Sequence, residues 1–261
     1  MSAGKVFLVG AGPGDPGLMT VKGLTLLQRA DVVIYDRLVD ETILKETRPE
    51  AEKIYVGKAS RFHTLPQESI IALLLQKARE GKTVVRLKGG DPFVLGRGGE
   101  EAEILAKQGI PFEVVPGVSS AIAVPAYAGI PVTHRDVASS FTVVTGHRAS
   151  DKDEPHIAWD KIGAGADTLV ILMGMKNLST VVGALMRTSR SPSTPVAVIT
   201  HGTTGRQRCI SGSLADIIEK VKAANLEPPS VVVIGEVVRF RETLDWFDAS
   251  SAGTSRGETK E

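Results

Sequence analysis

The stretch Val6-Phe-Leu-Val-Gly10-Ala-Gly-Pro-Gly14 decides how the first part of the chain folds. A short apolar run predicts a buried strand, and the glycines that follow let the backbone turn or come close to a ligand. Similar strands alternate with helical patterns as far as Val115, which predicts a largely parallel sheet covered by helices on both faces. The further strands are expected at 31–35, 53–56, 82–87 and 111–115, and the helices at 20–30, 66–80 and 99–108.

A Pro116-Gly117 pair ends this alternation, so we place a boundary there, between an N-terminal α/β domain over 1–116 and a C-terminal α/β domain over 117–248. The second half has more strands per helix, which favours a mixed sheet. Its strands are expected at 141–144, 168–172, 195–199, 207–210 and 230–234, and its helices at 178–187 and 213–224. The polar stretch 149–166 is expected to be a surface excursion and 249–261 a disordered tail.

The composition excludes several classes of protein. The 261 residues carry a formal net charge of +1 and 5% aromatic residues, which disfavours nucleic-acid binding. No apolar run reaches the roughly 20 residues of a membrane span, and a strand begins too soon after Met1 to leave room for a signal peptide. We therefore expect a cytoplasmic enzyme without a membrane partner. The 5 histidines lack metal-ligand spacing, so no metal site is expected, and Cys209 is interpreted as a small buried hydrophobe.

Two glycine-rich stretches carry the candidate chemistry. The first resembles a dinucleotide-binding loop, but Asp15 stands where the third glycine belongs, and Pro13 and Pro16 interrupt the turn into the helix. An acidic group there would also repel a pyrophosphate. The second stretch, Arg86-Leu-Lys-Gly-Gly-Asp-Pro-Phe-Val-Leu-Gly-Arg-Gly-Gly-Glu-Glu101, lacks the spacing of a phosphate-binding P-loop. Taken alone, it is also compatible with a turn-rich loop kept for its geometry.

Together these segments closely resemble the tetrapyrrole methylase family from about residue 4 to residue 247. An ordered set of motifs carries the resemblance: Val9-Gly-Ala-Gly-Pro-Gly-Asp-Pro, Val33-Ile-Tyr-Asp-Arg-Leu-Val39, Val56-Gly-Lys58, Val85-Arg-Leu-Lys-Gly-Gly-Asp-Pro-Phe93, Gly96-Arg-Gly-Gly-Glu-Glu101, Val115-Pro-Gly-Val-Ser-Ser120, Gly129-Ile-Pro-Val-Thr-His-Arg-Asp136 and Val144-Thr-Gly-His147. The Gly-Arg-Gly-Gly-Glu and Thr-His-Arg-Asp segments are similar to those of the members that methylate uroporphyrinogen III.

The resemblance implies two α/β domains with the active site in the cleft between them, a homodimer, and S-adenosylmethionine as methyl donor. It implies methylation of uroporphyrinogen III at C2 and C7, which gives precorrin-2 through precorrin-1 for sirohaem, cobalamin or haem d1. Some relatives carry an additional N-terminal dehydrogenase and ferrochelatase module. The sequence lacks that module, so we expect methylation alone.

The resemblance also assigns residues to the donor. These residues lie in the glycine stretches, at the predicted boundary and near two strand ends of the second domain: Pro13, Gly89, Gly90, Asp91, Val94, Ser119, Ser120, Met173 and Gly202. Backbone exposed at glycines can meet the many hydrogen-bonding groups of the donor, and Asp91 is suited to ribose hydroxyls or the methionine ammonium. Ser119 and Ser120 replace a Thr-Ala pair common in relatives.

The acceptor bears eight carboxylates, and arginine binds carboxylates in bidentate fashion with a permanent charge. Arg97 and Arg135 stand in the two matching motifs and are the main candidates. Arg37 is a weaker candidate, and His134 flanks Arg135, where it can touch the substrate.

Methylation of a pyrrole carbon also requires removal of a proton. Glu100 is the first choice of base, because it follows Arg97 at helical spacing and can face the same cleft. Asp36 and Lys58 are the second choice, as an acid/base pair implied by the resemblance. The sequence does not rank these bases. Two other functions stay open: a sister methylase acting on another corrinoid, and a donor-binding module without catalysis.

Overall fold

The computed structural model describes residues 4–57, 66–146, 157–188 and 190–250. The chain divides into two compact units, Met1–Ser119 (unit 1) and Ser120–Glu261 (unit 2). The junction predicted near Pro116-Gly117 lies a few residues before this division. Lys58 and the tail from 251 onward fall outside the described residues.

Unit 1 is built on a five-stranded sheet in the order β3-β2-β4-β1-β5, in which every pair of neighbours is parallel. This confirms the parallel sheet predicted from the alternating pattern. The strands are β1 (Val6–Gly10), β2 (Val32–Tyr35), β3 (Glu52–Tyr55), β4 (Val84–Lys88) and β5 (Phe112–Val115).

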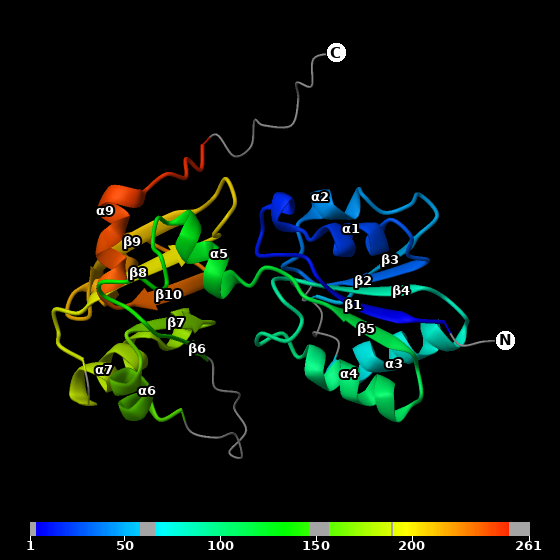
Figure 1. The fold of residues 1–261 in the computed structure, drawn as a ribbon, viewed down its shortest axis with the longest axis horizontal. Coiled ribbons are helices and arrows are strands. Elements are labelled where there is room, and N and C mark those ends of the chain that lie inside the picture. The colour runs from blue at the N-terminus through cyan, green and yellow to red at the C-terminus, as the bar shows by residue number, and fades with distance from the viewer. Residues whose placement is uncertain (1–3, 58–65, 147–156, 189, 251–261) are drawn as a thin grey trace, which may run out of the picture. The chain divides into compact units, whose positions relative to one another are not determined.

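Helices cover both faces of this sheet (Figure 1). They are α1 (Val21–Leu27), α2 (Glu41–Leu44), α3 (Gln67–Arg79) and α4 (Gly98–Lys107), with a short 3-10 turn at Pro16–Leu18. Side chains of α3 and α4 pack with Leu8 and Val84 in one hydrophobic cluster. Side chains of α1 and α2 pack with Val9 and Leu87 in a second cluster on the other face, as the period of two along a strand requires.

Unit 2 contains a five-stranded sheet in the order β6-β7-β10-β8-β9. The sheet is mixed, as predicted. β6 and β7 are parallel, whereas the other neighbouring pairs are antiparallel. The strands are β6 (Phe141–Thr145), β7 (Thr168–Leu172), β8 (Pro195–Thr200), β9 (Arg208–Ser213) and β10 (Ser230–Ile234). Because β7 and β8 both run against β10, their carboxyl ends lie at the same edge of the sheet.

The helices of unit 2 pack on two hydrophobic clusters, one on each face of the sheet. One cluster takes side chains of α7 (Leu178–Thr188) and α8 (Ile217–Ala223). The other takes side chains of α5 (Ser120–Tyr127) and of the 3-10 segment Glu236–Phe240. The remaining elements are α6 (Trp159–Gly165), the 3-10 turn Met175–Asn177 and α9 (Arg241–Leu244).

The structure corrects three expectations in unit 2. No helix was expected at α5, which carries Pro125 in its interior and has apolar residues on all sides, so its sequence shows no helical period. Part of the predicted excursion 149–166 is the helix α6, whose Trp159 packs against the core. The helix expected from 213 begins only at Ile217, because β9 extends to Ser213 and pairs with β8.

Across the described ranges, the helices are too short or too polar to traverse a lipid bilayer.

Candidate functional site

The carboxyl ends of β1 and β4 mark the point where the connections of the unit 1 sheet diverge. The chain leaves β1 toward α1 on one face and leaves β4 toward α4 on the other face (Figure 1). Ligands of open α/β sheets bind at such switch points. Two backbone hydrogen bonds join the loops there, from Gly12 N to Gly90 O (3.2 Å) and from Gly90 N to Gly12 O (2.7 Å). The two glycine-rich stretches of the sequence are therefore neighbours.

Glycine is required at this point because backbone packs directly against backbone. A Cβ atom on Gly117 would lie 2.3 Å from the carbonyl oxygen of Gly90, and one on Gly10 would lie 2.6 Å from that same atom. Gly12 and Gly90 also have φ values of 77° and 70°, which side chains rarely adopt. The loops after β1, β4 and β5 thus meet as bare main chain, and Pro13 lies within the first of them.

Asp91 holds the loops after β4 and β5 together. Its Oδ1 accepts hydrogen bonds from Phe93 N (2.8 Å) and Val94 N (3.1 Å), and its Oδ2 accepts one from Gly117 N (3.0 Å). Among the residues that the structure describes, Oδ2 accepts one hydrogen bond and Oδ1 accepts two, so Oδ2 keeps more capacity for a ligand. Gly89 packs tightly as well, since a Cβ atom there would meet the Leu38 side chain at 2.7 Å.

In unit 2, two of the donor candidates follow strands that end at the same edge of the sheet. Met173 comes directly after β7, is 50% exposed and has a φ of 56°. Gly202 follows β8 and packs against α5, where a Cβ atom would lie 2.4 Å from Val124. Ser120 begins α5, and Ser119 is the buried residue before it. The left-handed backbone of Met173 is notable, because a non-glycine residue held in this region often marks a functional position.

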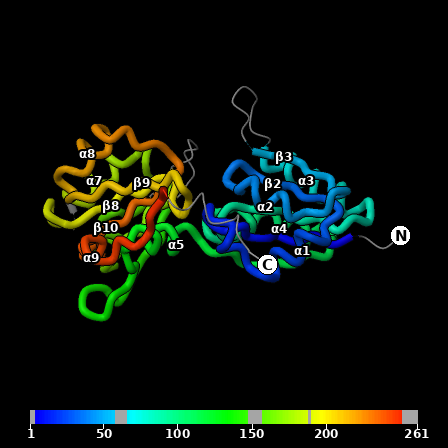
Figure 2. The backbone as a smooth tube through the Cα atoms, turned by 90° about the horizontal axis from the view of Figure 1, so that it is seen from above, coloured from blue at the N-terminus to red at the C-terminus, as the bar shows by residue number. Residues whose placement is uncertain are grey.

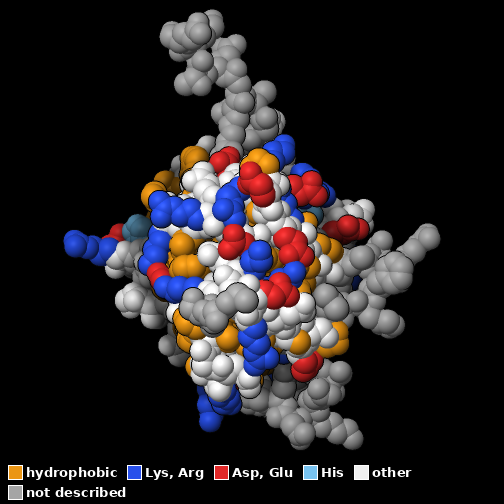
Figure 3. Space-filling model, turned by 90° about the vertical axis from the view of Figure 1, so that its right-hand side faces the viewer, with side chains coloured by type: hydrophobic (Ala, Val, Ile, Leu, Met, Phe, Trp, Pro, Cys, Tyr) orange, Lys and Arg blue, Asp and Glu red, His pale blue; other side chains and the backbone are white. Residues whose placement is uncertain are grey.

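Arg97 and Glu100 form a bidentate ion pair at the start of α4. Nε and Nη2 of Arg97 donate to the two Glu100 oxygens at 2.9 Å and 2.7 Å. This pairing lowers the pKa of Glu100 and raises that of Arg97. Both side chains are more than half exposed. Figure 3 shows basic and acidic side chains interspersed on the face of unit 1 that it presents. The pairing makes Glu100 a weaker proton acceptor than a free carboxylate.

The connection between α5 and β6 carries two acceptor candidates, His134 and Arg135, and forms a loop on unit 2 (green in Figure 2). A bridge between His134 and Ala138 closes the loop. The His134 ring stacks on Phe240 with centroids 4.1 Å apart, and its Nδ1 accepts a hydrogen bond from Asp136 N (3.2 Å). Arg135 is exposed at the tip. Arg37, in unit 1, is exposed after β2.

A buried ion network lies behind Asp36, and sequence reasoning missed it. Arg86 and Lys88 alternate along β4 and so share the face covered by α3 and α4, where Glu101 of α4 is fully buried. Glu101 Oε1 accepts from Arg86 Nε (3.2 Å) and Lys88 Nζ (3.1 Å), and Arg86 Nη2 lies 3.6 Å from Asp36 Oδ2. The sequence did carry a signal for this network: two cationic residues stand at alternate positions of an otherwise apolar strand, so both face the same side.

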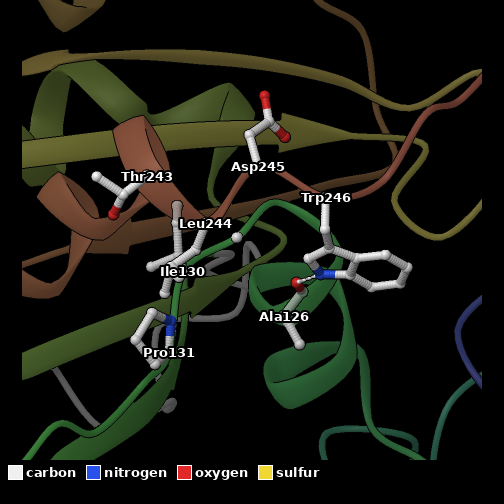
Figure 4. Close-up of a pocket in the computed structure, with 8 residues that line it drawn as sticks. Ala126, Ile130, Pro131, Thr243, Leu244, Asp245 and Trp246 are labelled. Carbon is white, nitrogen blue, oxygen red and sulfur yellow. Dashed lines mark hydrogen bonds between the residues drawn. The ribbon is translucent and has the colours of Figure 1, made fainter.

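The groove drawn in Figure 4 belongs to unit 2 and is lined by none of the candidate residues. Trp246 and Leu244 form part of its wall, and the indole of Trp246 donates to the Ala126 carbonyl oxygen (2.9 Å). Among the residues that the structure describes, no group of His, Cys, Asp or Glu is arranged to hold a metal ion. Cys209 is partly buried, and burial raises the pKa of its thiol to about 11.

The chain belongs to the tetrapyrrole (corrin/porphyrin) methylase family, whose model matches residues 5–218. A uroporphyrinogen-III C-methyltransferase of Methanocaldococcus jannaschii is 58% identical over 241 residues, which cover 92% of this chain and 99% of that protein. A siroheme synthase of Pseudomonas entomophila is 50% identical over 95% of this chain and 53% of its own length.

A solved structure shares the fold. It is the uroporphyrin-III C-methyltransferase of Thermus thermophilus in complex with S-adenosylhomocysteine, which is 42% identical with a TM-score of 0.78. The match covers 90% of this chain and 99% of that one. The predicted fold class, two α/β domains of the tetrapyrrole methylase type, is therefore confirmed.

Proposed function

We propose that the protein transfers methyl groups from S-adenosylmethionine to C2 and C7 of uroporphyrinogen III, giving precorrin-2 through precorrin-1. One observation carries the proposal: Gly10, Gly90 and Gly117 pack as bare backbone at the switch point of unit 1. This chain is also 58% identical to a protein named uroporphyrinogen-III C-methyltransferase.

The residues at this switch point fit the donor. Glycines stand where the loops after β1, β4 and β5 meet. Glycine lets main chain approach a ligand that carries many hydrogen-bonding groups. Asp91 Oδ2 retains acceptor capacity for a hydroxyl or an ammonium. We assign donor contacts to Pro13, Gly89, Gly90, Asp91, Val94, Ser119, Ser120, Met173 and Gly202. When bound, S-adenosylmethionine supplies an electrophilic methyl group on a sulfonium.

Exposed cations suit the polycarboxylate acceptor. Arg97 keeps its guanidinium at the start of α4, and Arg135 presents its own from the loop that follows α5. Arg97 can release Glu100, and Arg135 can release solvent, to bind a substrate carboxylate. A guanidinium binds such a group with two parallel hydrogen bonds. We propose Arg97 and Arg135 as the main acceptor contacts, with Arg37 and His134 as further ones.

We propose Asp36 as the proton acceptor. It is partly exposed, follows β2 at the carboxyl edge of the sheet, and is oriented by Leu38 N (3.0 Å) and by the Arg86 charge. Glu100, the first choice from sequence, is engaged by Arg97 at both oxygens. Its role as base stays a prediction, as does that of Lys58, which lies outside the described residues. Alignment of donor and acceptor also lowers the barrier to methyl transfer.

We further propose that the enzyme works as a homodimer in the cytoplasm and that its product feeds sirohaem, cobalamin or haem d1. The resemblance of the whole sequence to this family supports these points, and the similarity to a siroheme synthase supports the sirohaem branch.

A paired experiment tests the function. Calorimetry measures the binding of S-adenosylhomocysteine, and the red fluorescence of oxidised products follows the turnover of uroporphyrinogen III. We expect both to be positive. Turnover of a corrinoid but not of uroporphyrinogen III would indicate a sister methylase, and donor binding without any transfer would indicate a binding module.

A further inference from the structure

Glu101 is a buried carboxylate to which the proposed reaction gives no role. Its side chain is 0% exposed, and its Oε1 accepts hydrogen bonds from Gln67, Arg86 and Lys88. Its Oε2 has no hydrogen-bond partner within the part of the chain that the structure describes. A protein retains a buried charge only where neighbouring charges and hydrogen bonds hold it. The two cations beside Glu101 therefore indicate what it does.

Arg86 links Glu101 to Asp36. Its Nε donates to Glu101, its Nη1 donates to the carbonyl oxygens of Ile34 (3.3 Å) and Leu87 (3.0 Å), and its Nη2 faces Asp36. All three guanidinium nitrogens are thus engaged. The side chain is 4% exposed, so no water shell replaces these partners. Loss of the Glu101 charge would remove the partner of Arg86 Nε, the nitrogen on the same guanidinium as the Nη2 that faces Asp36.

Lys88 is the second cation, and it directly precedes the Gly89-Gly90 turn. Burial lowers the pKa of Lys88, and the nearby Arg86 charge lowers it further. The carboxylates of Glu101 and Asp36 raise it, and Glu100 on α4 also interacts with this ammonium. Without the Glu101 charge, the pKa of Lys88 falls further, and the ammonium becomes neutral at a lower pH.

We propose that Glu101 is a positioning residue for methyl transfer: it holds Arg86 against Asp36 and keeps the Lys88 ammonium charged beside the Gly89-Gly90 turn. The inference rests on the proposed function, in which Asp36 accepts the proton and this turn contacts the donor. It concerns the arrangement of groups around the reaction, because Glu101 is too deeply buried to touch a substrate.

The test compares Glu101→Gln, which removes the charge and keeps the shape, with the wild-type protein. Glu103→Gln is the matched control, because Glu103 lies on the same helix but is 62% exposed and pairs with Lys107. We expect Glu101→Gln to lower kcat between about tenfold and a hundredfold, the range for loss of one charge-assisted hydrogen bond. The KM values should change little, and kcat should decline at a lower alkaline pH than in the wild type.

A second readout does not depend on turnover. Carbon NMR of labelled lysine follows the Lys88 Cε signal with pH, and the signal is assigned by its loss in Lys88→Met. We expect this titration to move to lower pH in Glu101→Gln and to stay unchanged in Glu103→Gln. A wild-type pH profile together with an unmoved Lys88 titration in Glu101→Gln would overturn the inference.

Two further outcomes separate the inference from its assumptions. If the wild-type protein transfers no methyl group, the proposed function fails, whereas the Lys88 titration still tests the link to Glu101. If Glu101→Gln does not fold, Lys88→Met replaces it, and the alkaline decline in kcat should then disappear. A decline identical to that of the wild type would contradict a charged role for Lys88.

Discussion

A Cβ atom placed on Gly10 would lie 2.5 Å from the Cα of Gly117, so the loops after β1 and β5 touch through main chain alone. Because real Cβ atoms do not approach this closely, the contact admits only glycine. It also keeps side chains out of the place where we assign the donor.

Gly117→Ala should disturb this contact and weaken donor binding. The methyl group would press on Gly90 O and Gly10, which are backbone and cannot turn aside, and overpacking of this kind costs about 1–3 kcal/mol. Calorimetry should show the affinity for S-adenosylhomocysteine reduced by about tenfold or more. Gly165→Ala is the control, since a Cβ atom there meets nothing within 4 Å. Unchanged affinity in Gly117→Ala would argue against the donor assignment.

Arg97→Gln should raise the KM for uroporphyrinogen III by about tenfold or more, because it removes a bidentate contact to a substrate carboxylate. The KM of Arg97→Lys should lie between those of Arg97→Gln and the wild type, because lysine keeps the positive charge but cannot make the bidentate contact. Lys107→Gln, at the other end of α4, serves as the control. Steady-state kinetics at constant donor concentration measure all three. An equal change in KM for Lys107→Gln would show that only net charge matters.

Asp36→Asn should lower kcat more than Glu100→Gln does. A positioned base contributes about a hundredfold or more, whereas Glu100 is tied to Arg97, which lowers its pKa. Single-turnover rates with saturating substrates compare the two variants. Near-full turnover in Glu100→Gln would refute Glu100 as the base, and near-full turnover in Asp36→Asn would refute Asp36.

Glu113 should stabilise the fold only above mildly acidic pH. Hydrogen bonds from Lys22 and Lys5 lower its pKa from 4.5 to about 2. Because the folded-state pKa lies below the unfolded value, the contribution is complete above about 4.5 and is lost as the pH falls toward about 2. Thermal melts should therefore separate the wild type from Glu113→Gln at neutral pH and bring them together in acid. Added salt should reduce the difference, and a gap that persists at low pH would contradict this account.

Much of the fold was predictable because its elements have clear local patterns. The limits of β7 and β10 agree with the expected ranges, and α3 differs by one residue at each end. Where the pattern was absent, prediction failed: α5 is apolar on all sides and contains Pro125, so only its burial in the core makes it a helix. α6 was missed because its stretch is short and rich in glycine.

The candidate site was predictable only in part. Motifs in the sequence identified Asp36, Asp91 and the glycine loops, but contacts between distant segments were not visible. The hydrogen bond from Gly117 N to Asp91 joins residues 26 positions apart, and the one from Gln67 to Glu101 joins residues 34 positions apart. Register along β4 decides that Arg86 and Lys88 share the face of Glu101, and only the packed sheet shows this.

The number of methyl groups added to uroporphyrinogen III distinguishes a methyltransferase of this acceptor from a donor-binding protein. The purified protein is incubated with methyl-labelled S-adenosylmethionine and this acceptor, and mass spectrometry counts the labels on the product. We expect two labelled methyl groups per macrocycle, on ring carbons. A product without label, from protein that binds S-adenosylhomocysteine tightly, would contradict the proposed function.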